Sequence, residues 1–197
     1  MKTRKLRDIE VSVIGMGCMD FTHGYGAAPS EGESARLMRK AFDLGCTLYD
    51  TAEVYSAYAN EELVGKALKP IRDKVALSSK VHPAFLSGQE IPEGKLSRRG
   101  IRAALEGSLR RLQTDRLDLY YVHRIPAGTD MEALAEIFAE LAKEGKILAW
   151  GLSEATAEQI RKAHAAFPLS AVQSEYSMME RKWERAVSYT HLRAHET

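Results

Sequence analysis

Short apolar runs rich in β-branched and aromatic residues recur along the chain and predict buried β-strands. Between several of these runs the apolar residues fall three and four positions apart, which predicts helices with one apolar face. The sequence therefore alternates predicted strands with predicted helices over most of its length. The predicted strands are Val11–Met16, Cys46–Tyr49, Val75–Ser79, Leu117–Val122, Ile147–Trp150 and Ala171–Gln173. The apolar helix positions are Ala35, Met38, Ala41 and Phe42, then Ile101, Leu105, Leu109 and Leu112, then Leu134, Ile137, Phe138 and Leu141.

Local signals mark where these helices begin and end. Two pairs of residues have the spacing of a capping box, and two glycines follow predicted C-termini. A shorter helix, Glu61–Leu68, is expected to begin after Asn60 and to end before Pro70. The capping pairs are Ser30 with Glu33 and Thr156 with Gln159, and the glycines are Gly45 and Gly145.

Strands and helices in alternation are typical of a parallel sheet covered by helices, and two architectures have this pattern. A doubly wound sheet usually carries a G-x-G-x-x-G turn after its first strand. The nearest match, Gly15-Met-Gly17-Cys-Met-Asp20, lacks the third glycine, and a loop rather than a helix follows it. The pattern therefore favours an α/β fold of the TIM-type (β/α)₈ barrel. Because a full barrel has eight strands, the six predicted strands indicate an incomplete one.

Composition and charge narrow the range of functions. The 197 residues are 45% hydrophobic and 28% charged, which is ordinary for a globular domain. The formal net charge is +1 and Lys and Arg are spread along the chain, so neither nucleic acid nor an anionic membrane is an expected partner. A small molecule fits this charge better.

Cysteine and histidine usage narrows the range further. Cys18 and Cys46 are the only cysteines, too few for a disulfide framework, and they indicate a reducing compartment. The first residues contain no apolar stretch long enough for a signal peptide or a membrane span, so a cytoplasmic protein is expected. The histidines lack the spacing of metal ligands, and no metal site is predicted.

Polar residues stand where four of the apolar strands end. In a barrel, the C-terminal ends of the strands meet at one rim, which is where catalytic groups lie. Any one of these residues could be an ordinary cap or a solvated charge. An acid, a cation and an imidazole at the same rim, with a tyrosine close by, make a candidate site of proton transfer. The residues are Asp50, Tyr55, Lys80, His123 and Ser153.

Several segments around these residues resemble one known family. The stretch Asp50-Thr-Ala-Glu-Val-Tyr55, followed by Asn60-Glu-Glu-Leu-Val-Gly65, is similar to the signature of the aldo-keto reductases. Further similar segments follow in the family's order and spacing, from about Leu6 to about Arg185. The resemblance implies a barrel fold and a catalytic tetrad. The tetrad residues are Asp50, Tyr55, Lys80 and His123, and the further segments are Ser79-Lys80, Arg110–His123, Lys143–Ile147, Gly151–Ser153 and Gln173–Tyr176.

The chemistry of the implied reaction fits these side chains. Reduction of a carbonyl needs a hydride, which nicotinamide supplies, and a proton for the developing alkoxide. Tyr55 is the candidate acid. The pKa of a free tyrosine is about 10, so a nearby Lys80 ammonium would favour loss of its proton, and Asp50 would keep that lysine charged and oriented. His123 would donate a hydrogen bond to the carbonyl oxygen, as in an oxyanion hole.

The resemblance also implies an NADPH cofactor and its contacts. Residues at the end of the first barrel strand are expected along the cofactor, and two polar residues at the ends of later strands are expected to bind the carboxamide. One position departs from the common family pattern, because Glu154 stands where Asn is frequent, and an ionised carboxylate accepts but cannot donate. The expected contacts are Gly17, Cys18, Met19 and Asp50 for the cofactor, and Ser153 and Gln173 for the carboxamide.

Other polar residues have simpler interpretations. His23 and Tyr25 lie in a loop expected over the barrel mouth, where they could touch substrate or could have no function. Four arginines are assigned to the solvated outer face of one helix. They are Arg98, Arg99, Arg110 and Arg111.

The last residues do not continue the family pattern. Residues 1–187 are expected to form a partial barrel, and residues 188–197 resemble nothing in the family and are interpreted as a non-native tail. An open sheet of six parallel strands would expose its edges and inner face, so weak cofactor binding and little activity are expected of this chain.

Three hypotheses of function follow. The first is a reductase of small aldehydes or ketones, favoured by the four tetrad residues. The second is a cofactor-binding regulatory subunit of the same fold, and the third is an inactive fragment. The sequence leaves open which carbonyl is reduced and whether the protein forms oligomers.

Overall fold

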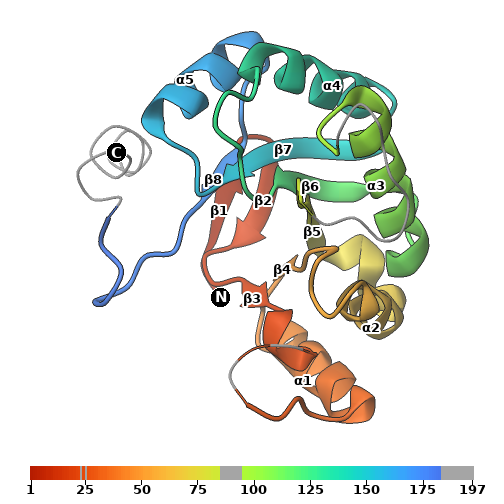
Figure 1. Cartoon of the computed structure of the whole chain (residues 1–197). Helices are drawn as coiled ribbons and strands as arrows, with labels where there is room; N and C mark the ends of the chain where they lie inside the picture. The colour runs from red at the N-terminus through yellow and green to blue at the C-terminus, as the bar shows by residue number, and fades with distance from the viewer. Residues whose placement is uncertain (23, 25, 85–94, 183–197) are drawn as a thin grey trace.

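A computed structural model describes residues 1–22, 24, 26–84 and 95–182 of the chain (Figure 1). The strands are β1 (Thr3–Leu6), β2 (Ile9–Ser12), β3 (Met16–Gly17), β4 (Leu48–Asp50), β5 (Ala76–Val81), β6 (Leu117–Val122), β7 (Ile147–Ser153) and β8 (Ala171–Gln173). The helices are α1 (Glu31–Asp43), α2 (Ala59–Leu68), α3 (Arg98–Leu112), α4 (Met131–Lys143) and α5 (Ala157–Ala166), with short 3₁₀ segments η1 (Met19–Phe21) and η2 (Lys69–Lys74).

Six parallel strands form one sheet in the order in which they occur along the chain, from β3 to β8. Each helix follows a strand and returns the chain to the start of the next, so the helices lie on one side of the sheet. Figure 1 shows them as an arc from α1 to α5 around a curled sheet, with the β1–β2 hairpin on the opposite side. This is an incomplete (β/α)₈ barrel, as the sequence predicted.

The side chains of the parallel sheet form two buried clusters, one on each face of the sheet. Side chains alternate between the faces of a strand, and residues paired across strands share a face. On the outer face, Tyr49, Tyr120 and Trp150 pack with the helices in the main apolar core. On the inner face, Leu119 and Tyr121 form a second cluster that the hairpin residues cover. The hairpin therefore covers this inner apolar cluster.

The predicted strand Val11–Met16 is wrong, because this segment contains parts of two elements. Ser12 ends the hairpin strand β2 and Met16 begins β3. Ser12 and Thr47 are joined by two hydrogen bonds of 2.9 Å, each from a backbone N–H to the other's hydroxyl oxygen. These bonds hold the chain at the crossing point where it leaves the hairpin and enters the parallel sheet.

The helix ends agree with the sequence in part. Thr156 and Gln159 form a complete capping box. At Ser30 only half of the predicted box is present, because its hydroxyl accepts the Glu33 N–H while the Glu33 carboxylate pairs with Arg36. Gly45 and Gly145 follow α1 and α4 with φ angles of 92° and 73°, as expected of glycines that end helices.

Asn60 and Arg111 do not have the roles that the sequence suggested. Asn60 is not the cap of α2 but lies inside the helix, fully buried. Arg111 is not solvated, because its Nε donates to the buried carboxylate of Glu61 at 2.6 Å and its guanidinium lies over the ring of Tyr58. Both side chains bond to residues far away in the sequence, which periodicity along one helix does not reveal.

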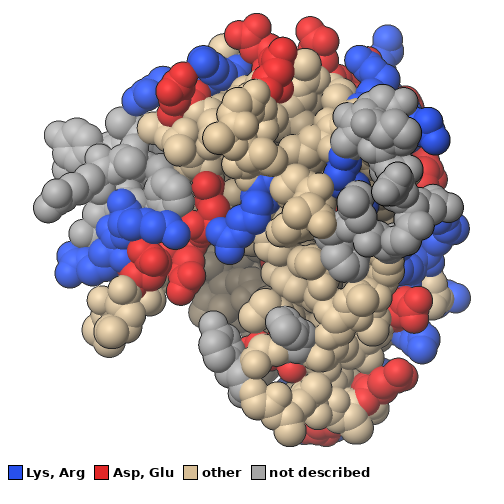
Figure 2. Space-filling view, in the orientation of Figure 1, with Lys and Arg blue, Asp and Glu red and all other residues tan. Residues whose placement is uncertain are grey.

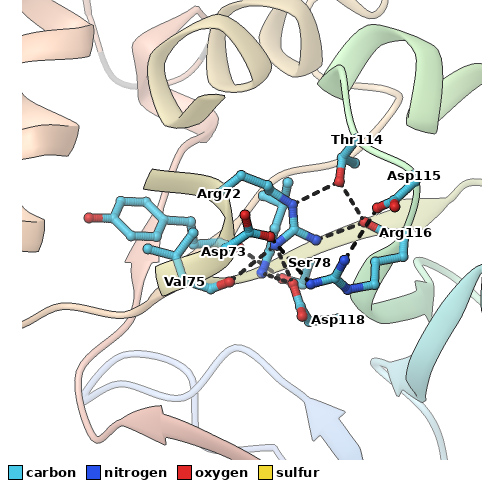
Figure 3. A network of polar contacts seen from close by, with 10 residues as sticks. Arg72, Asp73, Val75, Ser78, Thr114, Asp115, Arg116 and Asp118 are labelled. Carbon is cyan, nitrogen blue, oxygen red and sulfur yellow. Dashed lines mark hydrogen bonds and ion pairs between the residues drawn. The ribbon is translucent and has the colours of Figure 1, made fainter. Parts of the chain in front are cut away.

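A second polar network joins the N-terminal ends of β5 and β6 (Figure 3). The Asp118 carboxylate accepts the Leu77 N–H at 2.8 Å and pairs with Arg72 at 2.8 Å. The Arg72 guanidinium also donates to the carbonyl oxygens of Val75 and Arg116. The network fastens η2 to the turn before β6, at the end of the sheet opposite the candidate site.

Candidate active site

Asp50, Lys80 and His123 lie together at the C-terminal ends of three neighbouring strands. Asp50 pairs with Ser78 across β4 and β5, so Lys80, two residues later, lies on the same inner face. Lys80 in turn pairs with Tyr121, and His123 follows two residues after it. The backbone N–H of His123 donates to the Val81 carbonyl at 2.9 Å, which extends the pairing by one step.

Lys80 is the buried cation of this cluster. Its Nζ donates to the Asp50 carboxylate, to the Thr51 carbonyl at 2.8 Å and to the Tyr55 hydroxyl at 3.3 Å. Burial acts to lower the pKa of Lys80, but the opposing effects of Asp50 and Tyr55 prevail and the pKa is raised. The ammonium therefore stays charged at neutral pH despite complete burial.

Ser78 fixes the other oxygen of Asp50. The Ser78 hydroxyl donates to Asp50 Oδ1 at 2.6 Å, while Oδ2 accepts from Lys80. The sequence analysis did not select Ser78 as a site residue. Its position two residues before Lys80 in a strand was the available signal, because it places both side chains on the inner face.

Tyr55 is held over the cluster by a left-handed turn. Ser56, Ala57 and Tyr58 have φ angles of 48°, 48° and 80°, which cost about 1–2 kcal/mol each for residues other than glycine. The Ser56 hydroxyl donates to the Thr22 carbonyl at 2.8 Å and ties this turn to the loop after β3. Strain of this kind persists only where surrounding contacts impose it.

Asn60 makes further hydrogen bonds that hold the segments around Tyr55 together. Its Nδ2 donates to the Cys18 carbonyl and to the Thr22 hydroxyl, both at 2.8 Å. Its Oδ1 accepts from the Thr51 hydroxyl at 2.6 Å. One buried amide therefore joins α2 to the loops that follow β3 and β4.

His123 lies edge-on to Tyr55, with ring centroids 5.8 Å apart, and edge-on to His82, at 5.3 Å. Burial, with a smaller contribution from Lys80, lowers the pKa of His123 to about 3. The imidazole is therefore neutral at ordinary pH. Among the residues that the structure describes, its Nδ1 atom is buried without a hydrogen-bond partner.

The residues expected along a cofactor lie beside this cluster. Gly17 pairs with Asp50, and a Cβ at Gly17 would meet no atom within 4 Å. Cys18 is fully buried in the outer core, burial raises the pKa of its thiol, and its backbone N–H donates to the Asp50 carbonyl at 2.8 Å. Met19 is partly exposed in η1. The side chain of Cys18 thus packs in the core.

Ser153 and Gln173 are partners in the β7–β8 register, so their side chains share one face. Glu154 follows Ser153 in a left-handed conformation, with a φ of 55°. Its carboxylate accepts the Glu175 N–H at 2.6 Å and pairs with Lys182 at 2.9 Å. Glu154 thus fastens the segment after β8 to the end of β7.

The surface charges and the polar side chains also bear on other kinds of site. On the face shown in Figure 2, acidic and basic side chains are intermixed. Within the described ranges, three or more potential metal ligands do not gather anywhere, and no helix is apolar and long enough to cross a bilayer. His23, Tyr25 and residues 183–197, which include the predicted tail, lie outside the described residues.

Comparison with known proteins connects this geometry to one family. A model of the Aldo/keto reductase family matches residues 13–194. A probable aldo-keto reductase 1 from Glycine max is 39% identical over 181 residues, covering 90% of this chain and 51% of that protein. The chain thus spans about half the length of this curated relative.

Solved structures give the same result. The holo form of aldo-keto reductase AKR11C1 from Bacillus halodurans has a TM-score of 0.85 and 33% identity, covering 99% of this chain and 63% of that one. An aldo/keto reductase from Klebsiella pneumoniae, in complex with NADP and acetate, has a TM-score of 0.79 and 29% identity, covering 97% and 62%. The family match over most of the sequence and these structural relatives agree: the chain belongs to the aldo-keto reductase family.

Proposed function

We propose that the protein reduces an aldehyde or ketone to an alcohol with NADPH, and that Tyr55 delivers the proton. The observation that carries the proposal is the contact of 3.3 Å between the Tyr55 hydroxyl and the buried ammonium of Lys80. A phenol beside a fixed cation is a suitable proton donor, because the cation stabilises the phenolate that remains.

The residues at the rim fit a nicotinamide cofactor. The open space at Gly17 leaves room beside Asp50, and His123 carries a buried nitrogen without a partner among the described residues. Ser153 and Gln173 share a face at the rim, where a hydroxyl and an amide suit a carboxamide. The solved Klebsiella pneumoniae relative is a complex with NADP, which supports this choice of cofactor. When bound, NADPH supplies the hydride.

The side chains of the site supply the proton and orient the substrate. Tyr55 donates its proton to the carbonyl oxygen as negative charge develops there. Lys80 then faces a phenolate at the distance at which it now faces the phenol, so the proton transfer requires little rearrangement. Asp50 holds Lys80 in place through its ion pair, and Ser78 fixes the other oxygen of Asp50. His123, neutral because of its lowered pKa, donates one N–H to the same carbonyl oxygen and orients the substrate.

Tyr55→Phe tests this assignment. Removing the hydroxyl removes the proton donor, so turnover is expected to fall by about 10²- to 10⁴-fold while NADPH binding is retained. Turnover is measured as NADPH consumption with para-nitrobenzaldehyde, and binding by titration of NADPH fluorescence.

Tyr49→Phe is the matched control. The Tyr49 hydroxyl donates to the Met38 carbonyl at 2.8 Å on the outer face, so its loss costs about 1 kcal/mol of stability and leaves turnover unchanged. Equal turnover of Tyr55→Phe and the unmodified protein would refute the role of Tyr55. Because little activity is expected of an open six-stranded sheet, turnover is measured in a form of the protein extended to a closed barrel, and absence of carbonyl reduction there would refute the proposed function.

A further inference from the structure

A buried ion pair lies directly behind the turn that carries Tyr55. Glu53 is 1% exposed, and its Oε2 lies 3.3 Å from Nζ of Lys95, which is also buried. Burial raises the pKa of Glu53, while Lys95 and a backbone N–H oppose this effect. Burying two charges is costly, and replacing such pairs with apolar residues is often neutral or stabilising. Stability alone therefore does not account for Glu53.

Glu53 connects two segments that contribute to the site. Its Oε1 accepts the backbone N–H of His82 at 2.9 Å, two residues after Lys80. Its own N–H donates to the Lys80 carbonyl at 3.4 Å, and its carbonyl accepts the Tyr58 N–H at 3.1 Å. These bonds link the end of β5 to the left-handed turn after Tyr55.

The bonds of Glu53 complement those already described. Asp50 and Ser78 determine where the Lys80 ammonium lies, but among the described residues neither makes a hydrogen bond to Tyr55. Glu53 instead bonds to the backbone of the two segments that carry Lys80 and Tyr55. It bonds to Lys80 and His82 at the end of β5, and to Tyr58 in the turn after Tyr55. The bond to His82 also fixes the segment whose imidazole lies against His123. A loss of this bond would therefore alter the placement of Tyr55 relative to Lys80.

We propose that Glu53 is a positioning residue: its carboxylate holds the Tyr55 turn against the end of β5 by accepting the His82 N–H, and Lys95 offsets its buried charge. The expected effect on turnover rests on the proposed function. The expected effect on the position of Tyr55 does not.

The experiment compares two double variants that differ in one respect. E53M/K95M removes both charges and the acceptor while retaining side-chain volume. E53Q/K95M removes the same charges, but its amide oxygen still accepts the His82 N–H. Because neither variant leaves a buried charge unpaired, both are expected to fold. E62M, at an exposed position in α2, is the control.

Two readouts are used. Fluorotyrosine is incorporated and the Tyr55 resonance, identified by its loss in Tyr55→Phe, is followed by fluorine NMR. In E53M/K95M this resonance is expected to shift or broaden, and kcat to fall about 10- to 100-fold with an unchanged KM for NADPH. E53Q/K95M is expected to restore both, and E62M to change neither.

Two outcomes reject the proposal. If the Tyr55 resonance of E53M/K95M matches that of the unmodified protein, Glu53 does not position the turn. If E53Q/K95M is altered as much as E53M/K95M, the bond to His82 is not responsible. If the protein reduces no carbonyl even when extended to a closed barrel, the proposed function fails, and the NMR comparison still decides the role of Glu53.

Discussion

The protonation states at the candidate site follow from burial and from the nearest charges. Lys80 remains charged because Asp50 and Tyr55 compensate its burial, whereas burial and the nearby Lys80 cation lower the pKa of His123 and keep it neutral. A cation that stabilises a phenolate and a neutral imidazole that donates a hydrogen bond are the states that the proposed reaction requires. Both states depend on neighbours contributed by other strands.

The lowered pKa of His123 predicts a dependence of stability on pH. The unfolded chain takes up a proton on this histidine below about pH 6.5, whereas the folded protein takes it up only near pH 3. Stability should therefore fall as the pH decreases between these values, by at most about 1.4 kcal/mol per pH unit from this group. His82, whose pKa is also lowered, adds a contribution of the same sign.

The measurement is urea denaturation of the unmodified protein and of His123→Gln between pH 7 and pH 4. The variant should lose less stability over this range, because it lacks the group that the unfolded state protonates. Parallel curves for the two proteins would show that His123 is not held in its neutral form.

At the residue scale, spacing in the sequence identified the side chains that end strands but not those that support them. Asp50, Lys80 and His123 were predicted to lie together because parallel strands end at one rim, and they do. Ser78, Asn60 and Glu53 were not selected. Their bonds reach residues 28, 42 and 29 positions away, so only the folded chain brings the partners together.

At the scale of elements, the network around Asp118 joins β5 and β6 before their regular pairing begins. The Leu77 N–H bonds to the Asp118 carboxylate, and both Asp118 and Arg72 are about 10% exposed. Removing one partner of a buried pair leaves the other charge without compensation.

Asp118→Ala should therefore lower the free energy of unfolding by about 3–5 kcal/mol. Asp115→Ala is the control from the same network in Figure 3, because Asp115 is 85% exposed and its pair with Arg116 should contribute less than about 1 kcal/mol. The free energies of unfolding of both variants are measured by chemical denaturation. Similar losses of stability at the two positions would contradict the structural role of the buried Asp118 pair.

At the scale of the whole molecule, the β1–β2 hairpin and the helices occupy opposite sides of one sheet. Leu6 and Ile9 pack against the inner cluster, and Arg7 donates to the Pro168 carbonyl at 2.8 Å. The hairpin thereby contacts both the inner face and the loop before β8. It covers apolar surface that the helices, all on the outer side, do not reach.

Ile9→Asp should consequently destabilise the molecule by about 2 kcal/mol, because a charge replaces an apolar contact on the inner cluster. Glu10→Ala, an exposed neighbour on the same strand, should change stability by less than about 0.5 kcal/mol. Thermal unfolding of both variants tests this, and an unaffected Ile9→Asp would mean that the hairpin does not contribute to the core.

The sequence by itself determined the alternation of strands and helices, the incomplete barrel and the rim at which the polar residues meet. These features depend on local periodicity and on the fixed direction of parallel strands, which the order of residues contains. Only the tertiary structure decided that Val11–Met16 divides between a hairpin and a barrel strand, that Arg111 is paired inside the protein, and which buried oxygens hold the site. These outcomes depend on contacts between distant segments, where the need to pair every buried polar group selects partners that local pattern does not specify.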